Sequence, residues 1–263
     1  MLLQDSRPIP LSDLASPGFV SPKFGFNPRI VGGQNATEGQ FPYQISVRYY
    51  GSHNCRGSIL NKHWALTAAH CVDGYSVSAL NVVSGSIYLS GGGNFNNVIK
   101  VIVHSGSIYL SGGGNFNNVI KVIVHENWDP YNIKNALAVI KIDGEFDLGS
   151  NFISPIGLEH SFIEEKECVA SGWGRLYGGE GMRGLRLGPL KTLLIETDCR
   201  KRWGGVPVSE CEVCTLTQVG EGVCNGDSGS PLVIEGKQIG IVSWGNACAN
   251  GLPDVYTRIS CYD

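Results

Sequence analysis

The sequence predicts an all-β globular fold, and three observations support this prediction. The 263 residues include 36 glycines, and no long stretch repeats its apolar residues with the period of a helix. Hydrophobic residues make up 42% and charged residues 16%, a balance typical of a chain that buries a core. Short apolar or alternating runs have the length of strands. Three examples are residues 43–47, 137–142 and 239–242.

The first 29 residues differ from the rest of the chain. Residues 1–29 are rich in proline and serine without a repeating pattern, which predicts a flexible leader ahead of a domain over 30–263. No secretory signal is recognisable, because Met1-Leu2-Leu3 is followed at once by polar residues. Either the true start lies upstream or the chain is not exported in this form, and we favour the first explanation.

Composition also narrows the compartment and the partners. Nine cysteines are many for a cytosolic protein and indicate an oxidising compartment. Asn35-Ala36-Thr37 is a sequon for N-glycosylation, a weak signal consistent with secretion. The net charge is −3, no basic block occurs, and no apolar run has the length of a membrane span. We therefore expect a secreted, extracellular protein that has neither nucleic acid nor membrane as a partner.

One stretch of 21 residues occurs twice without a single change, at 84–104 and at 105–125. A solenoid needs at least three such units. Two perfect copies therefore favour a recent tandem duplication or an error of assembly, while a functional repeat remains the alternative.

Four short motifs occur in a telling order. Each alone is a weak signal, but their order and separation are specific. They read RIVGG at 29–33, LTAAHC at 66–71, GDSGSP at 226–231 and SWG at 243–245. Together they resemble the chymotrypsin/trypsin family of serine endopeptidases, and most closely its arthropod digestive and venom members, including brachyurin-like collagenolytic enzymes. The resemblance runs from Ile30 to about Ile259. It implies two six-stranded antiparallel β-barrels with the active site between them, and a closing carboxy-terminal helix that is truncated here.

This fold also predicts how the repeat is accommodated. By resemblance, the first barrel needs one strand matching Val83–Leu89 and another matching Val119–Val124. A closed barrel has no free edge for extra strands. The surplus residues must therefore loop out of the barrel, and the flanking sequences predict that these are roughly residues 90–117.

Ser228 and His70 are the candidate nucleophile and base. A serine hydroxyl needs an adjacent base to attack at neutral pH, and an imidazole titrates in the right range. The glycine-flanked loop allows a tight turn that aims the backbone N–H groups of Gly226 and Ser228 at one point, forming an oxyanion hole. Alone, such a serine would be a simple turn residue, but the other motifs favour catalysis. We expect surface or structural roles for the other five histidines, namely His53, His63, His104, His125 and His160.

Arg29-Ile30 resembles a zymogen cleavage site. In the family, the new ammonium of Ile30 enters the protein and pairs with the acid before the nucleophile, here Asp227, which orders the oxyanion hole and the specificity pocket. By resemblance, His53 contacts Asp227 before that event. The alternative is that Arg29 only ends the leader.

The chain departs from the family at the third catalytic residue. The segment that normally reads N-D-I-A-L-L-K-L begins here with Asn135-Ala136, so alanine replaces the acid. Asp129 and Asp143 lie outside the motif, and Ser243 normally flanks the missing carboxylate. In triads of this type, disabling the acid lowers turnover by about 10⁴, while roughly 10³–10⁴ over water remains. The prediction is a strongly impaired endopeptidase, and the alternative is an inactive homologue that binds protease partners or substrates.

Further departures concern the surroundings of the site. Arg56 replaces a glycine of the family's Cys-Gly-Gly-Ser and is expected near the leaving-group side, and Ser230 replaces another glycine. By resemblance, the pocket-floor positions hold Gly222 and Asp254, which predicts acceptance of both basic and large apolar side chains. Alternatively, Asp254 is an ordinary turn residue. The full predicted pocket is Gly222, Ser243, Trp244, Gly245 and Asp254.

Cysteine positions imply disulfides by resemblance. The implied pairs are Cys55–Cys71, Cys199–Cys214 and Cys224–Cys248, which leaves Cys168, Cys211 and Cys261 unassigned. At least one thiol must then stay free or pair between chains. No cluster has zinc spacing and the repeat lacks the carboxylates of the family's calcium loop, so we expect neither metal nor cofactor. The expected partners of a monomer are polypeptide substrates and protein protease inhibitors.

Overall fold

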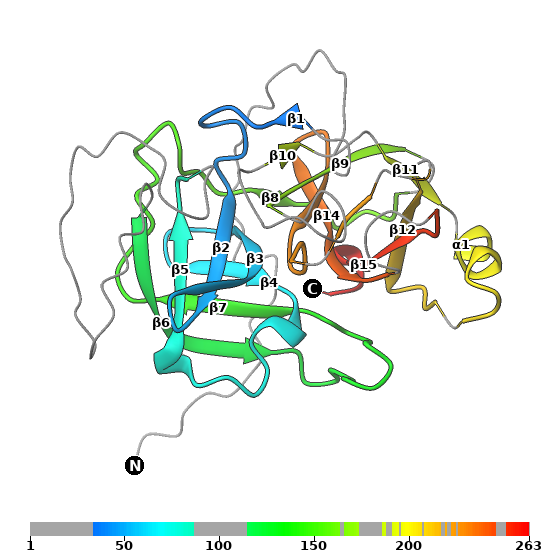
Figure 1. Ribbon diagram of the computed structural model, residues 1–263, viewed down its shortest axis with the longest axis horizontal. Coiled ribbons are helices and arrows are strands. Elements are labelled where there is room, and N and C mark those ends of the chain that lie inside the picture. Colours follow the sequence, from blue (N-terminus) through cyan, green and yellow to red (C-terminus); the bar gives the residue numbers. More distant parts are fainter. Residues whose placement is uncertain are drawn as a thin grey trace.

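A computed structural model gives the structure of the protein (Figure 1). It describes residues 34–86, 115–163, 166–173, 186–187, 191–194, 196–206, 208–216, 219, 222–224, 226–245 and 251–262. As predicted, these residues are almost entirely strands and loops.

Six antiparallel strands form a closed barrel in the first half of the chain. The strand order around the barrel is β2-β3-β4-β7-β6-β5. The bounds are β2 (Gln44–Tyr49), β3 (Ser52–Ile59), β4 (Trp64–Thr67), β5 (Leu80–Ser84), β6 (Asn115–Val124) and β7 (Ala138–Ile142). Aliphatic side chains that alternate along these strands fill the interior and are buried. They include Ile45, Val47, Ile59, Leu66, Val82 and Ile140.

The barrel takes its strands from both ends of the repeat. β5 ends at the first residue of the first copy, and β6 lies wholly within the second copy. The two strands pair with Ser84 opposite Asn115. This arrangement agrees with the expected use of the first copy's start and the second copy's end. The expected bounds were wrong at both ends, because the first strand is Leu80–Ser84 rather than Val83–Leu89, and 115–117 belong to β6 rather than to the surplus.

The second half of the chain, together with β1 from its first half, forms a nine-stranded sheet. Its order is β1-β10-β9-β11-β12-β15-β14-β13, with β8 paired to β14 in parallel. β13 also pairs with β9, which brings six of these strands back on themselves. The bounds are β1 (Gln34–Asn35), β8 (Gly157–Leu158), β9 (Glu167–Gly172), β10 (Arg186–Leu187), β11 (Lys191–Leu194), β12 (Glu212–Leu216), β13 (Pro231–Ile234), β14 (Lys237–Trp244) and β15 (Asp254–Arg258).

Helices are short in the described parts of the chain. They are α1 (Glu196–Arg202) and the 3₁₀ turns η2 (Ala69–Cys71), η3 (Val77–Ala79) and η4 (Ile259–Cys261). None of these helices is both long and apolar enough to cross a membrane.

The two β structures lie side by side, with β2–β7 on one side of Figure 1 and β9–β15 on the other. Their contact is partly apolar, since Ile241, Ile259 and Tyr262 belong to the same buried cluster as the first barrel's interior. It is also polar, because the Ser58 hydroxyl donates to the side-chain carbonyl of Gln238 at 2.6 Å. Apolar packing and hydrogen bonding therefore both hold the two halves together.

Candidate active site

His70 lies directly after β4, in the turn η2. The disulfide between Cys55 and Cys71 ties this turn to β3. A ring nitrogen of His70 lies within 4.8 Å of both sulfur atoms. The disulfide at Cys71 therefore fixes the backbone next to His70, the predicted base.

Ser228 lies in a tight loop that leads into β13. Gly226 and Gly229 on either side have φ angles of 93° and 84°, in the left-handed region that favours glycine. A Cβ atom at Gly229 would collide with the carbonyl oxygen of Arg56 and with the hydroxyl of Thr67. The glycines around the predicted nucleophile are thus required by backbone conformation and by close packing against the first barrel.

Hydrogen bonds join this loop to the strand that leads to His70. The backbone N–H of Arg56 donates to the carbonyl of Ser228 at 2.9 Å. The hydroxyl of Thr67, three residues before His70, donates to the carbonyl of Arg56 at 2.5 Å. The structure therefore brings the nucleophile's loop and the base's strand together across Arg56.

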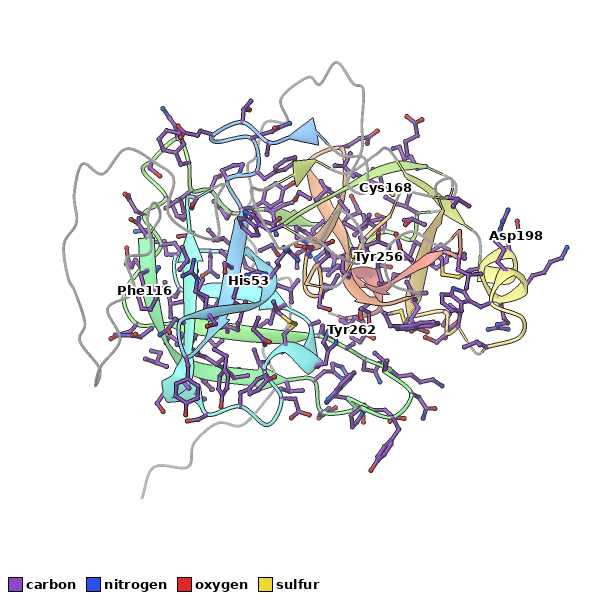
Figure 2. The ribbon with its side chains drawn as sticks, viewed as in Figure 1. His53, Phe116, Cys168, Asp198, Tyr256 and Tyr262 are labelled. Carbon is purple, nitrogen blue, oxygen red and sulfur yellow. A yellow bond between two sulfur atoms is a disulfide. The ribbon has the colours of Figure 1, made fainter. Side chains whose placement is uncertain are left out.

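Ala136 is fully buried just before β7. Its carbonyl accepts a hydrogen bond from the Thr257 hydroxyl at 3.3 Å. The side chain of Asn135, whose φ is 55°, accepts one from the Tyr262 hydroxyl at 2.9 Å (Tyr262 is labelled in Figure 2). Two residues of the second half thus hold this segment in place, and position 136 carries only a methyl group.

Two polar groups lack the partner that a carboxylate would supply. The hydroxyl of Ser243, on β14, is buried and makes no hydrogen bond to a described residue. An unpaired buried hydroxyl costs about 1–3 kcal/mol. Burial lowers the pKa of His70, and among the described residues no carboxylate opposes that shift. Both observations are expected where a buried acid is missing.

Ser243 and His70 line one cavity of about 330 Å³, together with Asp73, Trp128, Pro130 and Ile133. Asp73 is the acid of this lining, but its carboxylate accepts the indole N–H of Trp128 at 3.0 Å. The Trp128 ring lies 6.4 Å from the His70 ring, centroid to centroid. Asp73 therefore supports the cavity wall and is not hydrogen-bonded to His70.

The two acids that lie outside the motif are Asp129 and Asp143. The carboxylate of Asp129 accepts hydrogen bonds from the backbone N–H groups of Tyr131 and Asn132, within its own loop. Asp143 is exposed at the end of β7. Neither carboxylate is bonded to His70.

The predicted pocket residues converge from three segments. Asp254, at the start of β15, is buried, and its Oδ2 accepts the backbone N–H of Val223 at 3.0 Å, next to Gly222. A Cβ atom at Gly245 would lie 3.8 Å from Oδ1 of Asp254. Asp254 therefore lies in a strand and anchors the neighbouring segment, which corrects the alternative that it is an ordinary turn residue.

Trp244 forms a further part of this region. Its indole N–H donates to Oε1 of Glu212 at 2.6 Å, and its ring lies 5.0 Å from that of Trp203. Glu212 and Trp203 were not singled out from the sequence, and no motif marks them.

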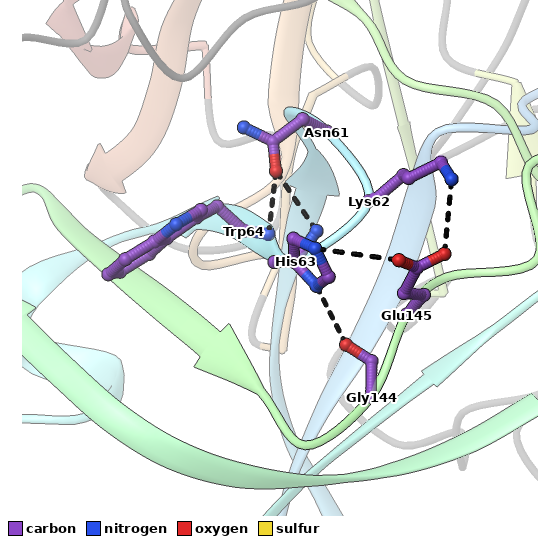
Figure 3. Close-up of polar contacts among 6 residues, drawn as sticks. All are labelled: Asn61, Lys62, His63, Trp64, Gly144 and Glu145. Carbon is purple, nitrogen blue, oxygen red and sulfur yellow. Dashed lines mark hydrogen bonds and ion pairs between the residues drawn. The ribbon is translucent and has the colours of Figure 1, made fainter.

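His63 belongs to a separate polar cluster that Figure 3 shows. Its Nδ1 lies 2.8 Å from the carbonyl of Gly144, and its Nε2 lies 3.6 Å from Glu145. Lys62 pairs with the same carboxylate at 3.2 Å, and the side chain of Asn61 accepts the backbone N–H of His63. These contacts agree with the structural role expected for His63.

Three further histidines are His125, His160 and His104. His125 accepts the backbone N–H of Asn127 at 3.2 Å and packs edge-on against Tyr262. His160 is half-buried. His104 lies outside the described residues.

Arg56 is the main surprise of the site. Its Nη1 lies 3.0 Å from Oδ1 of Asp227, and both side chains are at most 1% exposed. The backbone N–H of Cys224 donates to Oδ2 of Asp227 at 2.9 Å. The expectation that Arg56 lies near the leaving-group side was wrong, because its guanidinium is buried against Asp227.

His53, which the resemblance placed against Asp227, is bonded elsewhere. Its Nδ1 lies 2.8 Å from the hydroxyl of Ser46 (His53 is labelled in Figure 2). Burial lowers the pKa of His53 to about 3, the charge of Arg56 adds to that shift, and a backbone hydrogen bond to Gly226 opposes it. Arg29 and Ile30 lie outside the described residues, as does the side chain of Asn35.

The disulfides agree with the sequence in part. Cys55–Cys71 and Cys199–Cys214 are present as implied, and Cys224 is disulfide-bonded while Cys248 lies outside the described residues. Cys211 and Cys261, left unassigned by the sequence, form a further bridge. Cys168 is a buried thiol.

The described residues hold one group with metal-ligand geometry, made of Cys55, His70 and Cys71. Its two sulfurs are joined in a disulfide and cannot act as thiolate ligands.

Known proteins are similar to this chain over most of its length. The family model described as Trypsin matches residues 30–263. Chymotrypsin-2 of Vespa crabro is 35% identical over 233 residues, which cover 88% of this chain and 94% of that protein. Serine protease SP24D of Anopheles gambiae is 35% identical over 238 residues, covering 88% and 78%. Trypsin delta of Drosophila melanogaster is 34% identical over 237 residues, covering 88% and 85%. The chain therefore belongs to the trypsin family of serine proteases.

Proposed function

We propose that this chain is a secreted serine endopeptidase-type protein whose activity is strongly reduced because alanine occupies position 136. In the proposed reaction, His70 accepts the proton of Ser228 while the Ser228 oxygen attacks a peptide carbonyl. The N–H groups of Gly226 and Ser228 stabilise the resulting oxyanion. Substrates are polypeptides, as for other members of the trypsin family, and protein protease inhibitors are expected partners.

One observation carries the reduction of activity. The hydroxyl of Ser243 is buried without a hydrogen bond to a described residue, in the same cavity as His70. A carboxylate in this cavity would accept a hydrogen bond from that hydroxyl. It would also hold the imidazole in the tautomer that can accept a proton from Ser228. Without it, the imidazolium formed during attack has no counter-charge, so turnover falls by about 10⁴.

Three further features support the wider assignment. Asp254 is buried beside Gly222 and Val223, which fits a pocket that takes basic as well as large apolar side chains. The disulfides suit an extracellular protein. Cleavage after Arg29 removes the leader, and the sequon at Asn35 is a candidate glycosylation site on the resulting domain.

The test is peptide hydrolysis by the cleaved protein and by its Ala136→Asp variant. We expect the variant to be at least about 10³-fold faster, with Ser228→Ala abolishing activity in both backgrounds. Equal rates in the two proteins would mean that another group orients His70. If neither protein hydrolyses peptides yet both bind protease inhibitors or substrates, the chain is the inactive binding homologue instead.

A further inference from the structure

Arg56 and Asp227 form a buried ion pair between the two halves of the molecule. Their atoms lie 3.0 Å apart with both side chains buried. The guanidinium also lies over the Trp173 ring, 5.5 Å from its centroid. A Cβ atom at Gly172 would collide with Oδ1 of Asp227 and lie 3.4 Å from Nε of Arg56. The pair is thus enclosed by packed atoms rather than by solvent.

The charges of Arg56 and Asp227 balance each other. Asp227 brings one negative charge and Arg56 one positive charge, and an arginine guanidinium stays charged in proteins. An ammonium at Ile30, entering the same site, would leave an excess positive charge away from water, which is costly. The ammonium would also have to order a chain end, whereas Arg56 is already held in β3.

Arg56 contacts the loop of Ser228 at two points. Its side chain pairs with Asp227, the residue before Ser228, and its backbone N–H donates to the carbonyl of Ser228 at 2.9 Å. One residue of the first barrel therefore holds the loop at two successive positions. In a chain with glycine at position 56, only the backbone contact would remain.

We infer that Arg56 is a permanent internal counter-ion of Asp227, a positioning residue that holds the loop of Ser228 without the amino terminus at Ile30. Cleavage after Arg29 then removes the leader but does not switch this loop between two states. The inference rests on the proposed role of Ser228 and concerns how that site is regulated.

The experiment compares the full chain, uncleaved and cleaved after Arg29, in wild type and in Arg56→Gly. Mass spectrometry establishes the new amino terminus, and Arg29→Gln supplies an uncleavable form. We expect cleavage to move the melting temperature of the wild type by less than about 1 °C, and to raise that of Arg56→Gly by about 3 °C or more, because there the ammonium gains a carboxylate that has lost the Arg56 cation. Arg56→Lys, which keeps the charge, should behave as the wild type does.

Labelling of Ser228 by a fluorophosphonate gives an independent readout. It should proceed within about twofold in both wild-type forms, and about 10²-fold more slowly in uncleaved Arg56→Gly than in the cleaved variant, the cost of a lost oxyanion donor. If uncleaved Arg56→Gly does not fold, Arg56→Met replaces it in both measurements. A wild type that gains stability and labelling on cleavage as the variant does would overturn the inference. Absence of labelling in every form, including Ala136→Asp, would instead contradict the proposed function, and the melting temperatures would still decide the role of Arg56.

Discussion

The hydroxyl of Ser243 and the imidazole of His70 line the same cavity, and neither is hydrogen-bonded to a carboxylate of the described residues. The Ser243 hydroxyl is buried, so its missing partner cannot be replaced by bulk water. The hydrogen bonding of this cavity is therefore incomplete at Ser243, and no described carboxylate balances a charge on His70.

This incomplete balance predicts a pH profile. Burial lowers the pKa of His70, and a base acts only when neutral, so the acid limb of kcat/KM should lie below pH 6.5. In Ala136→Asp, a nearby negative charge should raise the pKa of His70 and move that limb to higher pH. The NMR titration of His70 gives the same comparison without any need for turnover.

The control for this profile is Ser243→Ala, which removes the unpaired hydroxyl but changes no charge. Its acid limb should coincide with that of the wild type. If Ala136→Asp left the titration of His70 unchanged, position 136 would not face the imidazole, and its alignment with the family's acid would be mistaken.

A second prediction concerns substrate choice. In the Ala136→Asp background, the protein should accept both basic and large apolar side chains before the cut, because Asp254 is buried beside Gly222 and the glycine leaves room. Asp254→Gly should remove basic activity selectively. A peptide-library profile measures both classes, and the matched control is Asp73→Asn, which alters an acid of the neighbouring cavity. An Asp254→Gly profile identical to that of its parent would exclude Asp254 from the pocket.

His53 predicts a loss of stability on acidification. Its pKa is lowered from 6.5 to about 3 in the folded protein, chiefly by burial. Between these values the unfolded chain binds a proton that the folded chain does not, so stability is full above pH 6.5 and falls as pH decreases. The free energy of unfolding should therefore drop by about 2 kcal/mol between pH 6.5 and pH 5 from this residue.

Urea unfolding at several pH values measures this drop, and His53→Gln should remove it. Ser46→Ala, which deletes the hydrogen bond to Nδ1 but keeps His53 buried, should retain it. An unchanged pH dependence in His53→Gln would assign the effect to other groups.

The bridge between Cys211 and Cys261 predicts a large contribution to stability. It joins residues 50 apart in the sequence and ties η4 to the start of β12. In the chain-entropy account, a loop of this length is worth about 4 kcal/mol. Cys261→Ser should therefore lower the free energy of unfolding by up to that amount in a urea titration. Cys211→Ser breaks the same bridge and should cost the same, while a loss below about 1 kcal/mol in both would mean that the bridge does not constrain the unfolded chain.

The short motifs lie at positions where the fold restricts the sequence. His70, Ser228 and Asp254 lie in or beside tight turns and strand ends, where glycine and backbone conformation restrict the sequence. The first barrel was predictable because its strands carry a regular apolar pattern. The start of β6 at Asn115 was missed because the identical copies give no local signal that separates one register from the other.

The pair of Arg56 and Asp227 was missed because its partners lie far apart in the sequence. The available signal was a balance of charge: a cation within a buried strand requires an anion, and Asp227 was already expected to be buried. The bridge of Cys211 and Cys261 was missed because cysteine connectivity does not follow from sequence alone. Only parity pointed to it, since three cysteines remained after the implied pairs.

The repeat yields the last prediction. Thirty residues, 85–114, join β5 to β6. Deleting 84–104 removes 21 residues yet leaves the sequences of both strands intact, because the copies are identical, so nine residues remain between the strands. Loop-closure entropy alone should then stabilise the protein by about 1 kcal/mol, which corresponds to a rise of about 2–4 °C in melting temperature.

The deletion should also raise solubility, because one Val-Ile-Lys-Val-Ile-Val run, a segment of high β-propensity, is lost. The matched control replaces residues 90–110 with a glycine-serine segment of equal length. This control keeps the loop-closure entropy but removes the apolar run, so it should gain solubility without the rise in melting temperature. Calorimetry and sedimentation measure the two effects separately. If the deletion lowered the melting temperature instead, the removed residues would have a structural role of their own, and the interpretation of the repeat as a recent duplication without structural purpose would be wrong.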